Sequence, residues 1–205
     1  VALNTTGSTG HATIDNGTTA LDVAQSSVGG NLNLTSGNSI TDSGTVTVGG
    51  NLAATTDANS GLINLGTLGV DGTVALATNG SGNATVVNDA GLNFAASNVG
   101  GNLVATATTG NMTDAGALTI NGTSSFTTSA NTATIVLDTT TNAFTRAVAL
   151  TTNHNSPEGR NDADVTIDGG TTALILAAST IDGDLIVRSG NASGITDSGT
   201  VTVGG

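Results

Sequence analysis

The stretch Val28–Gly50, VGGNLNLTSGNSITDSGTVTVGG, combines the two patterns that decide the fold. Alternation in NLNL (31–34) and TVTV (45–48) places Leu or Val on one face of an extended segment and Asn or Thr on the other. Gly, Asn and Ser interrupt the extended segments every seven to ten residues or so. The stretch therefore predicts short β-strands that are apolar on one face and joined by tight turns.

Both cassettes of this stretch recur along the chain. ITDSGTVTVGG at residues 40–50 returns unchanged at 195–205, which is 155 positions later, and variants of its ITDSG start at Val87 and Met112. The cassette of a β-branched residue, a small polar residue and Gly begins at Val28, Val48, Val70, Val99, Ile120, Ile181 and Val203. This spacing corresponds to a period of about 22 residues, which is typical of solenoid proteins.

A parallel β-solenoid explains this period better than other repeat folds do. Three strands of four to six residues fit into about 22 residues, and like residues would stack on like at about 4.8 Å per turn. Strands of a sandwich pair antiparallel and need no such phase, and the Leu-x-x-Leu-x-Leu frame of leucine-rich repeats is missing. We therefore predict an all-β solenoid of about nine turns with three short strands in each turn.

The longer repeat predicts the domain organisation. Residues 1–205 are expected to form one continuous solenoid that holds about 1.3 copies of a 155-residue unit, with 1–147 as the first copy and 148–205 as the start of the second. The chain is accordingly interpreted as an excerpt of a longer array. An insertion at 151–164 separates the copies, and its predicted protruding loop includes Asn155, Pro157, Glu158 and Arg160.

Composition and charge exclude several classes of function. The formal net charge is −12, and Lys, Cys, Trp and Tyr are absent. A strongly acidic chain disfavours nucleic acid and anionic membranes as partners. The chain also lacks a run of about 18 apolar residues, so membrane insertion is not predicted. The 37% hydrophobic content and the many β-branched residues favour a folded chain, whose interior we expect to include Phe94, Phe126 and Phe144.

Glycine and aspartate mark the predicted turns. Glycine supplies positive φ at corners in many turns, and we expect it to do so here. A turn Asp accepts hydrogen bonds from nearby backbone N–H groups, which is the role expected of the recurring Asp; calcium binding by the same carboxylates is the alternative. Calcium solenoids repeat Gly-Gly-x-Gly-x-Asp, which this chain lacks, so no cofactor is predicted. The turn glycines are Gly44, Gly49, Gly50, Gly100, Gly101, Gly116 and Gly199, and the calcium candidates are Asp42, Asp89, Asp114 and Asp197.

A paired-carboxylate site is the enzymatic alternative. Glu158, Asp162, Asp164 and Asp168 are close in sequence, as in β-helical enzymes that cleave polysaccharides. Such sites usually also carry aromatic platforms and clustered basic residues, whereas this chain has no Trp or Tyr and only three scattered Arg. His11 and His154 lie in turns without a second ligand nearby, so a metal site is not expected. We predict that the protein is not an enzyme.

The recurring GGNL, ITDSG and TVTVGG resemble the repeats of large secreted bacterial adhesins of the filamentous-haemagglutinin type. The resemblance implies a right-handed β-helix, export through an outer-membrane transporter and display on the cell surface. It implies no catalytic residues, because such repeats form shafts.

The function predicted from these observations is mechanical. The chain is expected to be a shaft segment of an extracellular fibrous adhesin or surface filament, with neighbouring repeats and further copies of itself as partners. A calcium-dependent adhesin with sandwich repeats is the alternative of different architecture, and its units of about 100 residues would lack the inner period.

Overall fold

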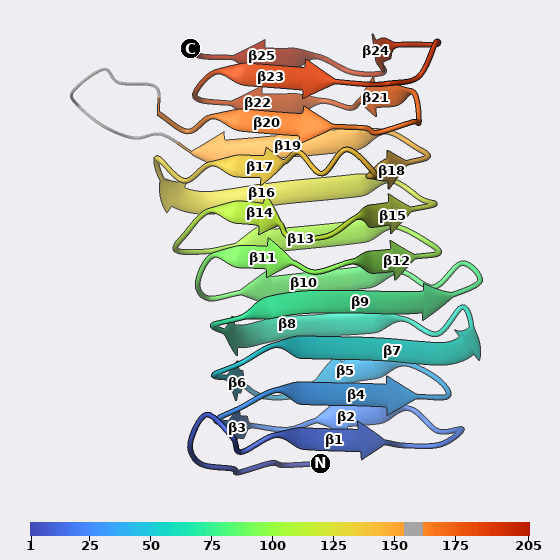
Figure 1. The fold of residues 1–205 in the computed structure, drawn as a ribbon, viewed down its shortest axis with the longest axis vertical. Coiled ribbons are helices and arrows are strands. Elements are labelled where there is room, and N and C mark those ends of the chain that lie inside the picture. Colours follow the sequence, from blue (N-terminus) through green and yellow to red (C-terminus); the bar gives the residue numbers. More distant parts are fainter. Residues whose placement is uncertain (154–161) are drawn as a thin grey trace.

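The computed structural model describes residues 1–153 and 162–205, whose strands stack into one rod (Figure 1). The rod contains about nine turns of about 21 residues each, and the two ends of the chain lie at its opposite ends. All strand pairs within the described residues are parallel, and these residues contain no helix. The predicted all-β parallel solenoid is confirmed.

The strands form two sheets that line opposite sides of the rod. Sheet 1 contains twelve strands. They are β1 (Ala12–Asp15), β4 (Leu32–Ser36), β7 (Leu52–Asn59), β9 (Thr73–Asn79), β11 (Leu92–Phe94), β12 (Ser97–Val99), β14 (Met112–Asp114), β15 (Leu118–Ile120), β17 (Ile135–Leu137), β18 (Ala143–Phe144), β20 (Val165–Asp168) and β23 (Leu185–Arg188).

Sheet 2 contains thirteen strands. They are β2 (Leu21–Val23), β3 (Ser26–Val28), β5 (Ile40–Asp42), β6 (Val46–Val48), β8 (Ile63–Val70), β10 (Ala84–Asn88), β13 (Leu103–Ala107), β16 (Ser124–Asn131), β19 (Val148–Asn153), β21 (Leu174–Leu176), β22 (Ser179–Ile181), β24 (Ile195–Asp197) and β25 (Val201–Val203).

The number of strands per turn varies more than the sequence indicated. Most turns have the predicted three strands, two of them in one sheet and one in the other. The turns from Leu52 to Asn88 are instead built from two strands each, because β8 runs unbroken from Ile63 to Val70 and pairs with both β5 and β6. A bend between two strands is therefore optional at this point of the turn.

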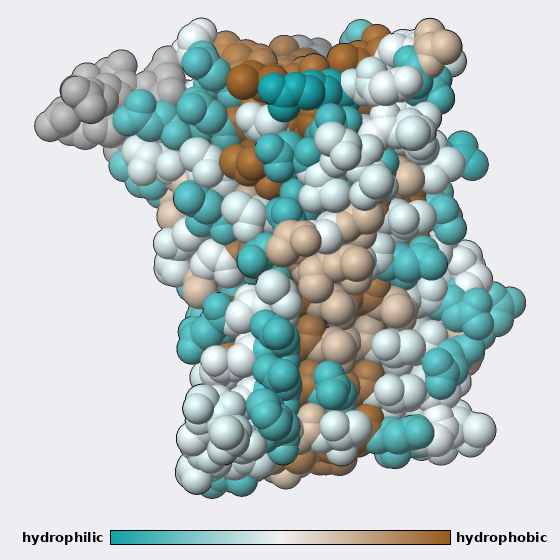
Figure 2. Space-filling model, viewed as in Figure 1, coloured by the Kyte–Doolittle hydropathy of each residue, from teal (hydrophilic) through white to brown (hydrophobic). Residues whose placement is uncertain are grey.

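Stacking keeps like residues in register from one turn to the next. Leu32 lies opposite Leu52, and Leu52 lies opposite Val74, so apolar side chains form columns inside the rod. Apart from Asp57, the outward positions of the same strands carry small or uncharged residues, and the face seen in Figure 2 shows a band of apolar residues along the long axis. The period-two alternation of the sequence thus separates interior from surface.

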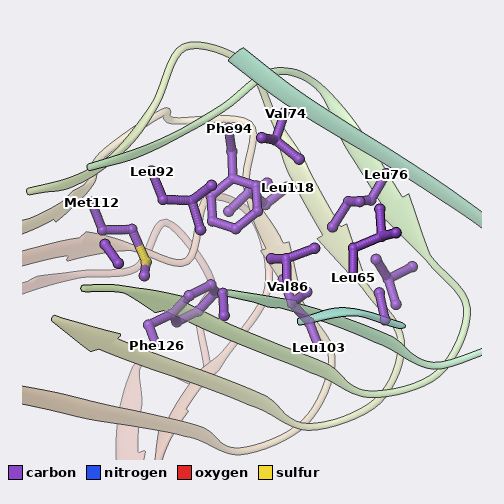
Figure 3. Close-up of a cluster of buried hydrophobic side chains, with 14 of the residues drawn as sticks. Leu65, Val74, Leu76, Val86, Leu92, Phe94, Leu103, Met112, Leu118 and Phe126 are labelled. Atoms are coloured by element: carbon purple, nitrogen blue, oxygen red, sulfur yellow. The ribbon is translucent and has the colours of Figure 1, made fainter. Parts of the chain in front are cut away.

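The interior is a continuous apolar core that runs through the rod. Phe94, Phe126 and Phe144 are fully buried, as predicted, and lie on β11 of sheet 1, β16 of sheet 2 and β18 of sheet 1. Their rings pack edge to face, with centroids 6.3 Å apart for Phe94 and Phe126 and 5.9 Å apart for Phe126 and Phe144. Leu92, Met112 and Leu118 surround the first of these pairs (Figure 3).

A shorter repeat than the predicted 155-residue unit is visible in the arrangement of the strands. β5 (ITD), β14 (MTD) and β24 (ITD) carry the same cassette but lie in sheet 2, sheet 1 and sheet 2, respectively. Ile40 pairs with Ile63, Ile63 with Ala84 and Ala84 with Leu103, so Leu103 lies three turns after Ile40. Met112 lies half a turn further along the chain. The cassette therefore returns after about three and a half turns, on the opposite side of the rod.

Candidate functional site

The recurring Asp residues hold consecutive turns together. Asp42 accepts hydrogen bonds through its two carboxylate oxygens from the backbone N–H groups of Gly66 (2.9 Å) and Thr67 (2.7 Å), which belong to the next turn. Asp114 lies on sheet 1, whereas Asp42 lies on sheet 2. It accepts equivalent bonds from the backbone N–H groups of Asp138 (3.1 Å) and Thr139 (3.4 Å), which follow β17 in the next turn of sheet 1. Both carboxylates thus accept backbone hydrogen bonds across turns, as well as a bond from Thr67 Oγ1 or Asn142 Nδ2.

The other two calcium candidates, Asp89 and Asp197, lie in turns other than those of Asp42 and Asp114. Asp89 is exposed at the end of β10, and Asp197 is exposed in the last described turn. The four carboxylates lie in four different turns, and residues 1–153 and 162–205 contain no group of three or more His, Asp or Glu side chains that could hold a metal ion. The described geometry therefore favours the backbone role of this Asp.

The turn glycines act by close approach and not by positive φ. None of the seven predicted positions has positive φ; among the described residues that conformation occurs at other glycines and at Ser60 and Thr132. A Cβ atom on Gly44, Gly116 or Gly199 would lie 2.5–2.7 Å from a backbone nitrogen of the preceding turn. The expected reason for glycine at these turns was wrong, because each turn lies directly against the one before it.

Asparagine at the corners forms a ladder that sequence reasoning missed. Asn31 Oδ1 accepts the N–H of Asn51 (3.0 Å), and Asn51 Oδ1 accepts the N–H of Thr73 (2.9 Å). Asn102 does the same for Thr123. The repeated GGN was the available signal, since a corner Asn after two glycines is in position to reach the next turn. His11 occupies the corresponding corner, and its Nδ1 accepts the N–H of Asn31 (2.8 Å).

A buried serine was also missed and has a comparable role. Ser26, Ser97 and Ser179 are each buried and donate to the carbonyl oxygen two residues earlier, at 2.7–2.9 Å. Each Oγ also accepts a backbone N–H from the adjacent turn at 3.0 Å. These hydroxyls satisfy buried backbone groups where the chain bends between two strands of one sheet.

The candidate paired-carboxylate residues are engaged with the backbone as well. Asp168 is buried and accepts the N–H of Gly170 (2.7 Å), and Asp164 Oδ1 accepts the N–H of Asp184 (2.8 Å). Glu158 lies outside the described residues, as do Asn155, Pro157, Arg160 and His154. Thr152 donates to the carbonyl of Ala163 (2.8 Å) and thereby joins the two described ends of the insertion.

Each of four hollows on the described surface is lined mainly by uncharged residues and by at most one carboxylate. One of them is lined in part by Asp71, Gly72, Gly91 and Asn93. Asn93 Oδ1 is buried without a hydrogen-bond partner there, and Asp71 is the single charged residue in this lining. The most repeated polar feature of the described residues is therefore the set of hydrogen bonds between adjacent turns. These residues contain no helix that could cross a membrane.

Comparison with known proteins identifies the repeat. No significant match was found among curated proteins or among solved structures. A family model described as repeats of unknown function (DUF5649) matches residues 9–79, 81–151 and 162–205. Its first two matches begin 72 residues apart, which is the spacing of Ile40 and Met112, so the 155-residue offset spans two family repeats. Since these matches cover most of the chain, the protein belongs to the DUF5649 family of repeats.

Proposed function

We propose that this chain is a shaft segment of an extracellular fibrous adhesin or surface filament, without catalytic activity of its own. The observation that carries the proposal is the use made of the repeated polar residues. Asp42, Asp114 and the corner Asn residues, which are the side chains with the most recurrent chemistry, hydrogen-bond to the backbone of adjacent turns. Selection for stacking explains such a surface better than selection for a ligand.

The mechanical argument is that each turn supports the next. Parallel ladders along the rod and a continuous apolar core resist extension and keep the rod straight. Repeats of this kind set a length, since each 72-residue unit of about three and a half turns adds roughly 17 Å. The resemblance to adhesin repeats supports placing the rod at a bacterial cell surface, with an outer-membrane transporter as its export partner.

A change in repeat number tests the proposal directly. The full protein, with one family repeat removed or duplicated, would be displayed on its native cells with an epitope tag beyond the repeats. Electron cryotomography with a gold-labelled antibody should place the tag roughly 17 Å nearer or farther per repeat. An unchanged tag distance, or a protein retained inside the cell, would overturn the shaft role.

A further inference from the structure

We propose that the two flat faces of the rod are equivalent docking surfaces, each of which binds a further copy of the same chain. The inference deepens the proposed shaft role by naming a lateral partner, and it is tested by a different measurement. It starts from the 72-residue family repeat, whose three and a half turns place equivalent outward positions on both sides of the rod.

Two grids of outward residues define these surfaces. In the first matched segment the grid lies on β4, β7 and β9 of sheet 1, and in the second it lies on β13, β16 and β19 of sheet 2. Register is the same in both, with three turns and two columns. The sheet 1 face comprises Asn33, Thr35, Ala53, Thr55, Ala75 and Ala77; the sheet 2 face comprises Val104, Thr106, Ser125, Thr127, Ala149 and Thr151.

The chemistry of both faces suits packing against a second flat sheet. Their twelve side chains are uncharged and mostly small, so two such sheets can approach to the roughly 10 Å of face-to-face packing. Large apolar side chains are exposed on each side at one equivalent position, Val104 on sheet 2 (43%) and Ile186 on sheet 1 (47%). Figure 2 shows the corresponding apolar band along one side of the rod.

Acidic residues are placed so that they permit contact through the faces. Between Thr73 and Ile181, the described Asp residues lie at bends or close a strand, and the two that close a strand, Asp114 and Asp168, accept backbone hydrogen bonds. Among the described residues, outward carboxylates within strands lie near the rod ends at Asp15, Asp22 and Asp197, and at Asp57 on β7, at the border of the sheet 1 face. Repulsion between bends therefore disfavours contact through the edges and leaves the faces available.

The size of a face is at the lower end of what specific association requires. Nine turns at about 4.8 Å and a strand width of about 15 Å give roughly 650 Å² per partner. Stable interfaces bury about 800 Å² per partner, and weaker specific ones bury less. Because one rod has two such faces, displaced from each other by half a turn and roughly 17 Å along the axis, association does not close at a dimer and extends into layers.

Charge placed on one face or on both tests this geometry. The sheet 2 variant is Thr127→Glu with Ala149→Glu, the sheet 1 variant is the equivalent Thr55→Glu with Ala75→Glu, and a third variant combines all four. The control, Asn121→Glu with Thr141→Glu, adds the same charge at exposed bends. Circular dichroism would verify the fold of each, and light scattering of the 205-residue chain over a concentration series would give particle mass.

The outcomes separate cleanly. The unmodified chain and the control should form particles larger than two chains, each one-face variant should stop at about twice 19.6 kDa, and the four-site variant should be monomeric. An unmodified chain that stays monomeric at millimolar concentration overturns the inference, as does equal loss of assembly in the bend control. If the variants fail to fold, the concentration series of the unmodified chain still decides. The tag-distance measurement is unaffected by any of these results.

Discussion

At the scale of single residues, side-chain size decides how closely two turns can approach. Gly116 lies against the backbone of Ala96, and Gly44 and Gly199 lie in the same way against Gln25 and Ala178. Gly66 is different, because a Cβ atom there would have no neighbour within 4 Å and its φ is not positive. Only some glycines of this glycine-rich chain are therefore required by packing.

The substitution Gly116→Ala should lower the free energy of unfolding by about 1–3 kcal/mol, because the added methyl overpacks the contact with Ala96. Gly66→Ala should be neutral or stabilise by up to about 1 kcal/mol, since alanine reduces the entropy of the unfolded chain. Urea unfolding of both variants checks this pair. Equal losses in the two would mean that close approach is not what selects glycine.

Asp42 provides a residue-scale test of the calcium alternative. Asp42→Asn puts an amide group where two N–H donors converge, so we expect a loss of about 1–3 kcal/mol in unfolding free energy. The melting temperature of the unmodified chain should be the same in millimolar calcium as in a chelator. A calcium-dependent rise that Asp42→Asn abolishes would restore the metal role, because a ligand that binds only the folded state stabilises it.

At the scale of elements, a strand is defined by its place in the family repeat and not by its sheet. β7 and β16 have identical burial patterns, and each is followed by a residue with positive φ, Ser60 and Thr132, yet β7 belongs to sheet 1 and β16 to sheet 2. The interior is accordingly symmetric enough to accept either orientation. Its largest asymmetry is the Phe94, Phe126 and Phe144 cluster.

Phe126 links the other two rings of this cluster, and its truncation tests how tightly the interior is packed. Phe126→Ala should cost about 3–5 kcal/mol of unfolding free energy, because a buried ring is lost and a cavity is left. Phe126→Leu should cost less than about 1.5 kcal/mol if the neighbours repack around it. Chemical denaturation measures both, and a loss below about 1 kcal/mol for alanine would indicate a loosely packed core.

At the scale of the whole molecule, the rod is a sum of repeats that are related by a half-turn and a shift along the axis. Stability in such a stack is shared between neighbouring turns, so no single turn is indispensable. What must be preserved is the match between the edge of one turn and the edge of the next.

Deletion of residues 52–123 removes one family repeat and joins Asn51 to Ser124, so that β16 takes the place of β7. The shortened chain should keep its β-sheet circular dichroism and a cooperative thermal transition. Deletion of only residues 52–87 joins Asn51 to the buried Asn88 and should abolish the transition, although it removes half as many residues. If the shorter deletion kept the transition and the longer one lost it, the 72-residue family repeat would not be the folding unit.

The sequence by itself determined the fold, because alternation and a period near 22 follow from strand geometry. Both patterns can be recognised before it is known which strands pair. Val28, Leu32, Ile40 and Val48 could be assigned to the interior from their spacing alone, and they are buried. The Asp of ITDSG could likewise be predicted as an acceptor of backbone N–H groups. The boundaries of the 155-residue copies stay a prediction.

Only the tertiary structure decided which turn each side chain reaches and which face it lies on. Asp42 hydrogen-bonds residues 24 and 25 positions later, and the positions of Gly66 and Thr67 relative to it depend on the path of the whole turn. The offset of 72 between Ile40 and Met112 was legible in the sequence, but that it equals a half-integral number of turns was not. Turn lengths vary with each bend, so the rotation between repeats follows only from the stacked structure.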